Sequence, residues 1–206
     1  WQSSGTLNYY PLYKANYFWD ETANRITLNN ADETTYYASY GAINAFNLII
    51  ENALTSKDAS EDAKRVVWAQ AKVLRAMTYF NLVNFYADTY DASTASTKLS
   101  VPLITSANVN APYTQISIQA MYDFILKDME EAVPYLPETG ATILHPSIGT
   151  AYAFYARLYL QMNDYTQALS YADKALTENN QLYDWTAYYE ANKAQIENAT
   201  SYIRTT

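Results

Sequence analysis

Helical periodicity dominates the pattern of hydrophobic and polar residues along the chain. Between residues 34 and 54, apolar side chains recur at spacings of three and four residues, which predicts an amphipathic helix. Residues 62–86 carry two adjacent apolar stripes, so we expect a helix that is covered on two sides. The same periodicity predicts further helices over residues 117–135, 147–162, 165–177 and 188–198.

Polar segments separate these helices. Asp58 and Glu61 have the spacing of a capping box, which predicts that the helix over 62–86 starts directly after them. Residues 87–111 are rich in Ser, Thr, Asn and Asp, so we expect a long connection with one short strand near residues 101–104. Ser147 is the expected N-cap of the helix that follows. The pattern therefore predicts an all-α protein with long loops.

Small residues alternate with tyrosines in the last strongly patterned helix pair. Alanine beside bulky residues on a helix usually marks a close approach of a second helix. This arrangement is typical of the tetratricopeptide pair, in which two antiparallel helices cross at small side chains. The expected contact residues are Tyr152, Tyr155, Ala156 and Tyr159 on the first helix, and Ala168, Leu169, Ala172 and Ala175 on the second.

Composition narrows the class of partner. The chain has 206 residues, half of them hydrophobic, and a formal net charge of -8. This negative charge argues against nucleic acid or an anionic membrane surface as the main partner, because both require a positive field. The chain contains no cysteine, which excludes disulfides and thiolate metal sites. It begins at Trp1 with no signal peptide and no bilayer-length apolar run, so we expect a targeting segment outside this sequence.

Catalytic and cofactor chemistry finds little support. His145 is the only histidine, and its place between Leu144 and Pro146 favours a role in turn packing. The carboxylates Asp128, Glu130 and Glu131 lie beside an apolar stripe, which favours a solvated helix face over an acid/base pair. Four glycines provide no phosphate-binding loop. We therefore expect no enzyme activity, no cofactor and no metal.

Four motifs follow one another in a fixed order along the chain: "WAQAKVLRAMTYFNLVNFYAD" (68–88), "VPLI" (101–104), "IQAMYDFILKDMEEAVPYLPE" (118–138) and "GTAYAFYARLYLQMNDYTQALSYADKAL" (149–176). In this order they resemble the SusD/RagB family of nutrient-binding lipoproteins, and the resemblance covers roughly residues 36–180. The family's Gly-Asp-Val-Pro-Leu junction corresponds to Ala87, Asp88 and residues 101–103 here. This sequence departs from that junction in two ways, since alanine replaces the glycine and residues 89–100 are inserted.

The resemblance implies an architecture and a cellular role. The fold would be an α-solenoid-like, right-angled stack of tetratricopeptide-like antiparallel helix pairs with long loops. Residues 1–33 would form a pre-helical loop segment, 34–180 the helical domain, and 181–206 the start of a C-terminal region missing from this chain. Members capture glycans or other nutrients at the cell surface for a SusC-like TonB-dependent transporter. The implied location is the outer membrane, reached through a lipid anchor outside this chain.

Glycan recognition needs exposed aromatic faces with polar groups at their edges, and "NYFWDETANR" (16–25) supplies both. By similarity, the family draws part of its stacking surface from this pre-helical region. The candidate ligand-binding residues are Tyr17, Phe18, Trp19, Asn24 and Arg25, with Tyr90 as a further candidate in the long loop. Two alternatives stay open, because Trp19 could equally cover the repeat core, and a helical-repeat adaptor could bind a protein or peptide instead of an oligosaccharide or polysaccharide.

Overall fold

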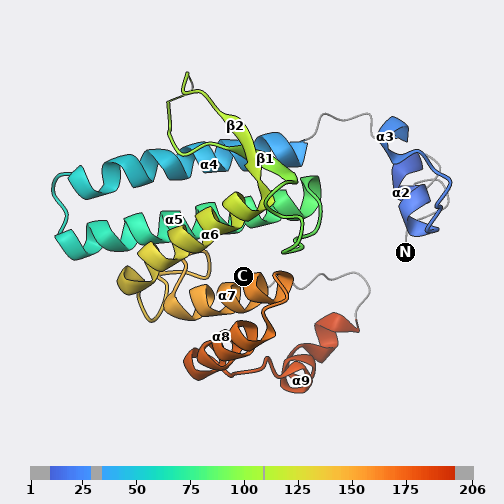
Figure 1. Cartoon of the computed structure of the whole chain (residues 1–206). Helices are drawn as coiled ribbons and strands as arrows, with labels where there is room; N and C mark the ends of the chain where they lie inside the picture. The colour runs from blue at the N-terminus through green and yellow to red at the C-terminus, as the bar shows by residue number, and fades with distance from the viewer. Residues whose placement is uncertain (1–9, 29–33, 109, 198–206) are drawn as a thin grey trace. The chain divides into compact units, whose positions relative to one another are not determined.

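The computed structural model describes residues 10–28, 34–108 and 110–197 (Figure 1). The chain divides into two compact units, Trp1–Tyr135 and Leu136–Thr206, and each is described by itself. The elements of the first unit are α2 (Pro11–Tyr17), α3 (Arg25–Leu28), α4 (Thr34–Asn52), η1 (Ala53–Thr55), α5 (Glu61–Tyr86), β1 (Leu99–Leu103), β2 (Thr114–Ser117), α6 (Ile118–Ala132) and η2 (Val133–Tyr135). Those of the second are α7 (Ile148–Gln161), α8 (Tyr165–Glu178) and α9 (Trp185–Ile196).

The long helix α5 forms the centre of the first unit. It packs against α4 on one side and α6 on the other, so the prediction of a helix covered on two sides is confirmed (Figure 1). Its two ends are more open, since Val67 and Phe85 are 48% and 72% exposed. The core between the helices is made of Val73, Tyr79, Phe80, Leu82 and Val83 from α5 and Met121, Tyr122, Ile125 and Met129 from α6.

The start of α5 differs from the predicted capping box. Ser60 is the N-cap, and its hydroxyl accepts a hydrogen bond from the Ala63 N–H at 3.2 Å. Asp58 lies two residues earlier in the left-handed region, with φ of 65°. Aspartate tolerates this conformation better than most residues, so its place is in the turn and not at the cap. The prediction for Asp58 and Glu61 was therefore wrong, and Glu61 forms an ion pair with Lys64 instead.

The polar connection after α5 contains the expected short strand. β1 pairs antiparallel with β2, with an irregularity in the register between Leu99 and Pro102. The pattern did not predict β2, because four residues are too few to establish an alternation. Among the described residues, these two strands form a single two-stranded sheet, and helices account for most of the remaining structure. The all-α fold class is confirmed.

In the second unit, α7 and α8 form an antiparallel helix pair. The chain reverses at Asn163, whose φ is 61°, and Asp164 then caps α8 by accepting the Gln167 N–H at 3.0 Å. At the other end of the pair, a Cβ placed on Gly149 would lie 3.1 Å from Glu178 Cβ, so the start of α7 lies beside the end of α8. Ser147 caps α7 as expected.

The small-residue contact between these helices is confirmed in part. Ala168 is buried on the face of α8 that meets α7, whereas Ala156, Ala172 and Ala175 are partly buried. Leu169 is 65% exposed, so its predicted place in the contact is wrong. Adjacent residues on a helix point about 100° apart, and Ala168 already occupies the facing position.

Two described parts of the chain contain helices that the sequence pattern did not delimit, residues 10–28 and the start of α9. Residues 10–28 contain the short helices α2 and α3, where a loop segment was expected. The expected helical domain over residues 34–180 spans the boundary between the two compact units, which lies after Tyr135. The expected boundary at residue 180 stays a prediction, and the helix expected over 188–198 begins earlier, at Trp185.

Candidate functional site

The aromatic segment after α2 is held in a defined turn. Helix α2 ends at Tyr17, and Trp19 then adopts a left-handed backbone conformation with φ of 53°. Two hydrogen bonds close the turn, from the Trp19 N–H to the Asn16 carbonyl at 3.3 Å and from the Asp20 N–H to the Ala15 carbonyl at 2.9 Å. A positive φ is uncommon for a residue with a side chain of this size, so the turn around it has to support the conformation.

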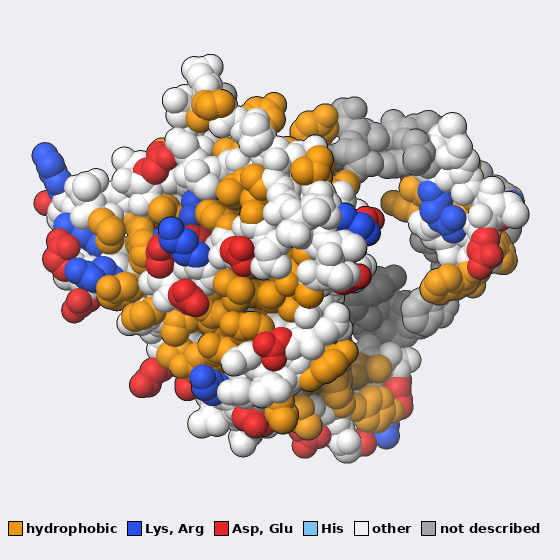
Figure 2. Space-filling model, in the orientation of Figure 1, with side chains coloured by type: hydrophobic (Ala, Val, Ile, Leu, Met, Phe, Trp, Pro, Cys, Tyr) orange, Lys and Arg blue, Asp and Glu red, His pale blue; other side chains and the backbone are white. Residues whose placement is uncertain are grey.

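This turn presents three aromatic rings to solvent. Trp19 is 86% exposed, and Tyr17 and Phe18 are 64% and 62% exposed. The Tyr17 and Phe18 rings meet edge to face with centroids 5.1 Å apart, which limits their movement relative to one another. Figure 2 shows hydrophobic side chains on the surface of the part formed by α2 and α3. The stacking role of Trp19 and its alternative role as a cover of the repeat core both stay predictions.

Polar side chains lie in the same segment as the rings and bond to one another. Arg25 donates from Nε to Asn16 Oδ1 at 2.9 Å, which ties the start of α3 to the end of α2. Asn24 Oδ1 accepts the Thr27 N–H at 3.2 Å and so acts partly as a cap of α3. The side chain of Asp20 accepts two hydrogen bonds from Thr22, and these bonds lower the pKa of this carboxyl.

A shallow pocket of about 160 Å³ lies within the same segment. Phe18 and Asp20 contribute to it, together with Pro11, Lys14, Ala15, Ala23 and Leu28. The segment therefore combines a small concave surface with exposed rings and hydrogen-bonding groups. These are the elements that a sugar requires: C–H faces stack on the rings, and hydroxyls bond to polar groups at the ring edges.

Tyr90 has a different environment from the other candidates. It is 7% exposed, its hydroxyl donates to Gln119 Oε1 at 2.8 Å, and its ring lies 4.8 Å from that of Tyr122. A ligand could not stack on this ring as it lies. Its burial could not be read from the sequence, because it depends on how residues 87–98 fold back onto α6.

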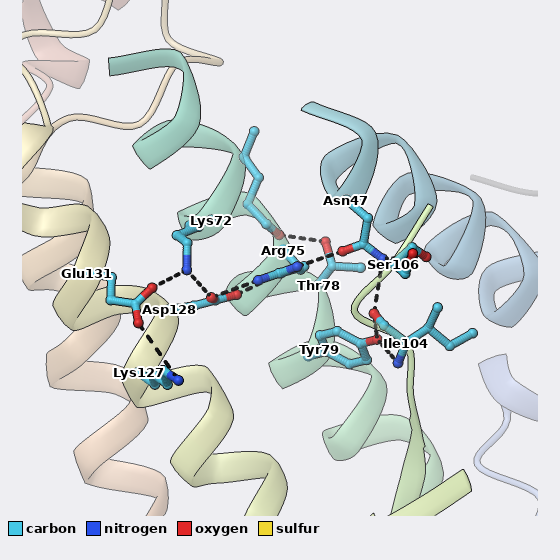
Figure 3. A network of polar contacts seen from close by, with 11 residues as sticks. Asn47, Lys72, Arg75, Thr78, Tyr79, Ile104, Ser106, Lys127, Asp128 and Glu131 are labelled. Carbon is cyan, nitrogen blue, oxygen red and sulfur yellow. Dashed lines mark hydrogen bonds and ion pairs between the residues drawn. The ribbon is translucent and has the colours of Figure 1, made fainter. Parts of the chain in front are cut away.

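The acidic group on α6 was misread as a solvated face. Asp128 is 2% exposed and lies at the centre of a cluster of ion pairs (Figure 3). Arg75 donates to it from Nε at 2.7 Å and from Nη2 at 2.8 Å, and Lys72 donates from Nζ at 2.9 Å. Lys72 also pairs with Glu131, and this hydrogen bond lowers the pKa of the Glu131 carboxyl. Glu130 is exposed, as expected.

This cluster continues to the loop after β1. Arg75 donates from Nη1 to Asn47 Oδ1 at 2.6 Å, and Asn47 Nδ2 donates to the carbonyls of Ile104 and Ser106 at 3.1 and 3.2 Å (Figure 3). Tyr79 holds the same loop, because its hydroxyl donates to the Ile104 carbonyl and accepts from the Ile104 N–H, both at 2.8 Å. Burial raises the pKa of Tyr79 to about 12. The polar chain is therefore a structural support that fixes the loop onto α4 and α5.

A signal for this cluster was present in the sequence. Lys72 and Arg75 lie within the most apolar helix, where an unpaired charge would be costly. Two cations at such positions require acidic partners on a neighbouring helix, and Asp128 lies within the apolar stripe of the next one. Pattern alone could not identify the partner, because the pairing joins positions 53 and 56 residues apart.

The remaining candidates for chemistry are His145 and groups of metal-binding side chains. His145 is exposed in a turn, with Nδ1 2.8 Å from Thr142 Oγ1, in agreement with its expected place. Within residues 10–28, 34–108 and 110–197, no group of three His, Cys, Asp or Glu side chains is arranged to hold a metal ion. No helix in these ranges is both long enough and apolar enough to cross a bilayer.

Comparisons with known proteins agree on one family. The SusD-like family model, described as "Starch-binding associating with outer membrane", matches residues 7–160. SusD-like protein P2 of Formosa agariphila is 30% identical over 131 residues, which cover 63% of this chain and 24% of that protein.

Solved structures show the same fold. A SusD superfamily protein of Bacteroides thetaiotaomicron is similar with a TM-score of 0.66 and 22% identity, over 74% of this chain and 34% of that one. A putative sugar binding protein of Bacteroides vulgatus is similar with a TM-score of 0.65 and 20% identity, over 73% and 34%. The chain thus spans about a quarter to a third of the length of these relatives.

Proposed function

We propose, from the premise that this chain belongs to the SusD-like family, that it contributes to non-catalytic capture of a glycan at the cell surface. The observation that carries the proposal is the turn after α2, which exposes Tyr17, Phe18 and Trp19 beside Asn24 and Arg25. In this proposal the sugar stacks on the rings and bonds to the neighbouring amide and guanidinium groups. No covalent bond in the glycan is broken.

Delivery to a transporter is the second part of the proposal. The glycan would pass to a SusC-like TonB-dependent transporter, with the protein held at the outer membrane by a lipid anchor outside this chain. The family description, which places members at the outer membrane, supports this location. Purification of the protein from detergent-solubilised outer membranes tests the partner, and we expect a TonB-dependent barrel to co-purify in stoichiometric amount. Recovery of the protein without such a barrel would contradict this part.

Affinity electrophoresis in gels containing soluble starch, laminarin or another neutral polysaccharide tests the binding surface. We expect the full-length protein to be retarded in at least one gel. Trp19→Ala should weaken this retardation by about ten- to a hundredfold, since loss of a well-stacked ring removes about 1.5 to 3 kcal/mol of burial. Tyr113→Ala is the matched control, because Tyr113 is 63% exposed but lies outside the segment.

The results separate the parts of this proposal. Equal retardation of Trp19→Ala and the unmodified protein would remove Trp19 from the binding surface. Absence of retardation by any glycan in the panel would contradict glycan capture and favour the helical-repeat adaptor.

One observation favours the adaptor as the second candidate. An apolar groove of about 390 Å³ lies between the end of α4 and the start of α5, and Leu48, Ile49, Ala53 and Val67 contribute to it. Such a groove could hold an apolar side chain of a bound peptide. Val67→Asp would place a charge in the groove and should therefore weaken binding of an apolar peptide side chain there. If glycan capture is the function, the same variant should leave glycan retardation unchanged, because the groove lies outside the proposed glycan-binding turn.

A further inference from the structure

A second group of exposed aromatic side chains lies in the other unit, around the start of α9. Tyr183, Trp185 and Tyr188 contact one another in all three combinations. The ring centroids are 4.9 Å apart for Tyr183 and Trp185, 5.5 Å for Tyr183 and Tyr188, and 6.0 Å for Trp185 and Tyr188. We refer to these three residues as the α9 aromatic cluster. Because its members lie within six positions of the chain, the local backbone alone determines its geometry.

The cluster is open to solvent. Trp185 is 72% exposed and Tyr183 is 59% exposed, while Tyr188 is partly buried beneath them. Figure 2 shows hydrophobic side chains on the surface around α9. Rings packed against each other with their outer faces in water form a platform and not a core.

The polar ends of these rings are available to a ligand. Among the described residues, no hydrogen bond involves the hydroxyls of Tyr183 and Tyr188 or the indole N–H of Trp185. The neighbouring Tyr189 contrasts with them, because its hydroxyl donates to Glu197 Oε1 at 2.6 Å and Lys193 lies 5.6 Å from its ring centroid. The sequence therefore places one tyrosine in a local structural role and leaves three aromatic groups with unused donors.

The backbone beneath the cluster is well supported. Asp184 caps α9 by accepting the Ala187 N–H at 2.9 Å. This cap fixes the first turn of α9, which carries Trp185 and Tyr188 three positions apart on one face. A preorganised platform loses little conformational entropy when a ligand binds.

The charged residues near the cluster in the sequence favour an uncharged ligand over an anionic one. The ionised side chains of residues 175–192 are Glu178, Asp184 and Glu190. The two lysines that flank this range, Lys174 and Lys193, lie over the rings of Tyr171 and Tyr189 and not over the cluster. An anionic lipid surface or an acidic polymer would meet repulsion here. The carboxamides of residues 179–181 flank the cluster in sequence, and although Asn179 Oδ1 and Asn180 Oδ1 each accept a hydrogen bond from Gln181, their amide nitrogens are donors suited to hydroxyl groups.

The exposed area of the cluster suits a small ligand better than a stable protein partner. Stable protein partners bury about 800 Å² on each side, whereas three rings offer only a fraction of that area. A sugar unit needs no more than one or two ring faces.

We propose that the α9 aromatic cluster is a second saccharide-binding surface, which takes uncharged sugars by stacking on Trp185 and Tyr183. This inference rests on the proposed glycan-capture function and adds a separate surface to it. Its binding would not depend on the turn that carries Trp19.

Affinity electrophoresis with the full-length protein and neutral polysaccharides tests the inference. We expect Trp185→Ala to reduce retardation at least threefold in a gel that retards the unmodified protein, and Trp185→Phe to recover most of it because a ring is retained. Leu182→Ala is the matched control, since Leu182 is 94% exposed and apolar but carries no ring. The double variant Trp19→Ala with Trp185→Ala should bind more weakly than either single variant.

Each outcome bears on one proposal. If Trp19→Ala weakens binding and Trp185→Ala does not, the second surface is refuted and the proposed function stands. If Trp185→Ala alone weakens binding, the second surface stands and the turn at Trp19 is not a binding surface. If the unmodified protein binds no glycan, glycan capture itself fails. Sedimentation velocity provides a further test, because loss of self-association on Trp185→Ala, with glycan binding unchanged, would show that the cluster is a protein contact.

Discussion

The carboxylate at the centre of the buried ion-pair cluster gives the sharpest test of the fold of the first unit. Asp128→Ala leaves the cations of Lys72 and Arg75 without their shared partner, and these residues are only 6% and 4% exposed. Removal of one partner from a buried ion pair costs about 3 to 5 kcal/mol, because the remaining charge is desolvated without compensation. We expect the free energy of unfolding to fall by about this amount.

The contacts of Asp128 account for the size of this effect. Arg75 donates two hydrogen bonds to the carboxylate and Lys72 donates one. Hydrogen bonds to charged groups contribute about 1.5 to 3 kcal/mol each, so simple addition would exceed the expected value. The loss is smaller than this sum because Lys72 keeps its ion pair with Glu131 and because water can enter the space that the carboxylate vacates.

Urea denaturation measures the effect directly. With a slope of about 2 kcal/mol/M, the midpoint should fall by about 1.5 to 2.5 M. Glu130→Ala on the same helix is the control, and because Glu130 is exposed its effect should stay within about 0.5 kcal/mol. A loss of less than about 1 kcal/mol for Asp128→Ala would refute the assignment of Asp128 as the compensating charge of a buried network.

Three other predictions address packing, turns and pH. Ala168→Leu should overpack the contact between α7 and α8 and cost about 1 to 3 kcal/mol in thermal unfolding, whereas Leu169→Ala, at an exposed position, should change little. Gly140→Ala should destabilise the second unit, because the added Cβ would collide with the His145 carbonyl oxygen. Gly41→Ala should stabilise α4 by about 0.5 to 1 kcal/mol, because the added Cβ meets no neighbour within 4 Å. Chemical denaturation of the two variants measures both effects. The hydrogen bond from Lys72 lowers the pKa of the Glu131 carboxyl in the folded protein below its ordinary value of 4.5. The ionised carboxylate therefore contributes fully to the free energy of unfolding above pH 4.5, and this contribution is lost as the pH falls through the lowered pKa of the folded state. Glu131→Gln should therefore reduce the acid-induced loss of stability, and an unchanged pH profile would contradict this linkage.

Local periodicity accounts for most of what the sequence predicted about the fold. The limits of α4, α5, α7 and α8 agree with the predictions to within about two residues, because each helix carries an apolar face of regular spacing. The close contact at Ala168 was also predictable, since a small residue between larger ones requires a nearby helix. The motif order identified the family for the same reason, because it is a property of the sequence alone.

Features that depend on distant residues could not be predicted in this way. Asp128 lies within an apolar stripe, but its partners could not be identified from the local pattern, because Lys72 and Arg75 approach it from another helix. Tyr90 has the local pattern of an exposed loop residue, and only the return of the loop onto α6 buries it. The exposure of Trp19 was one of two open alternatives, since a tryptophan in a polar segment fits either a surface or a cover.

The tyrosines within the described ranges differ in the state of their hydroxyl groups, and this difference bears on the two proposed surfaces. Tyr40 and Tyr79 donate to the backbone carbonyls of Pro102 and Ile104, so their hydrogen-bonding capacity already serves the fold. Tyr17 and Tyr183 have exposed rings, and no hydrogen bond within the described ranges involves their hydroxyls. Most buried tyrosines satisfy their hydroxyl within the protein, with Tyr122 as an exception among the described residues, whereas the hydroxyl of an exposed tyrosine can bond to water or to a ligand. In the proposals above, Tyr17 and Tyr183 are the tyrosines that could stack on a sugar, because each has an exposed ring and lies two residues from an exposed tryptophan.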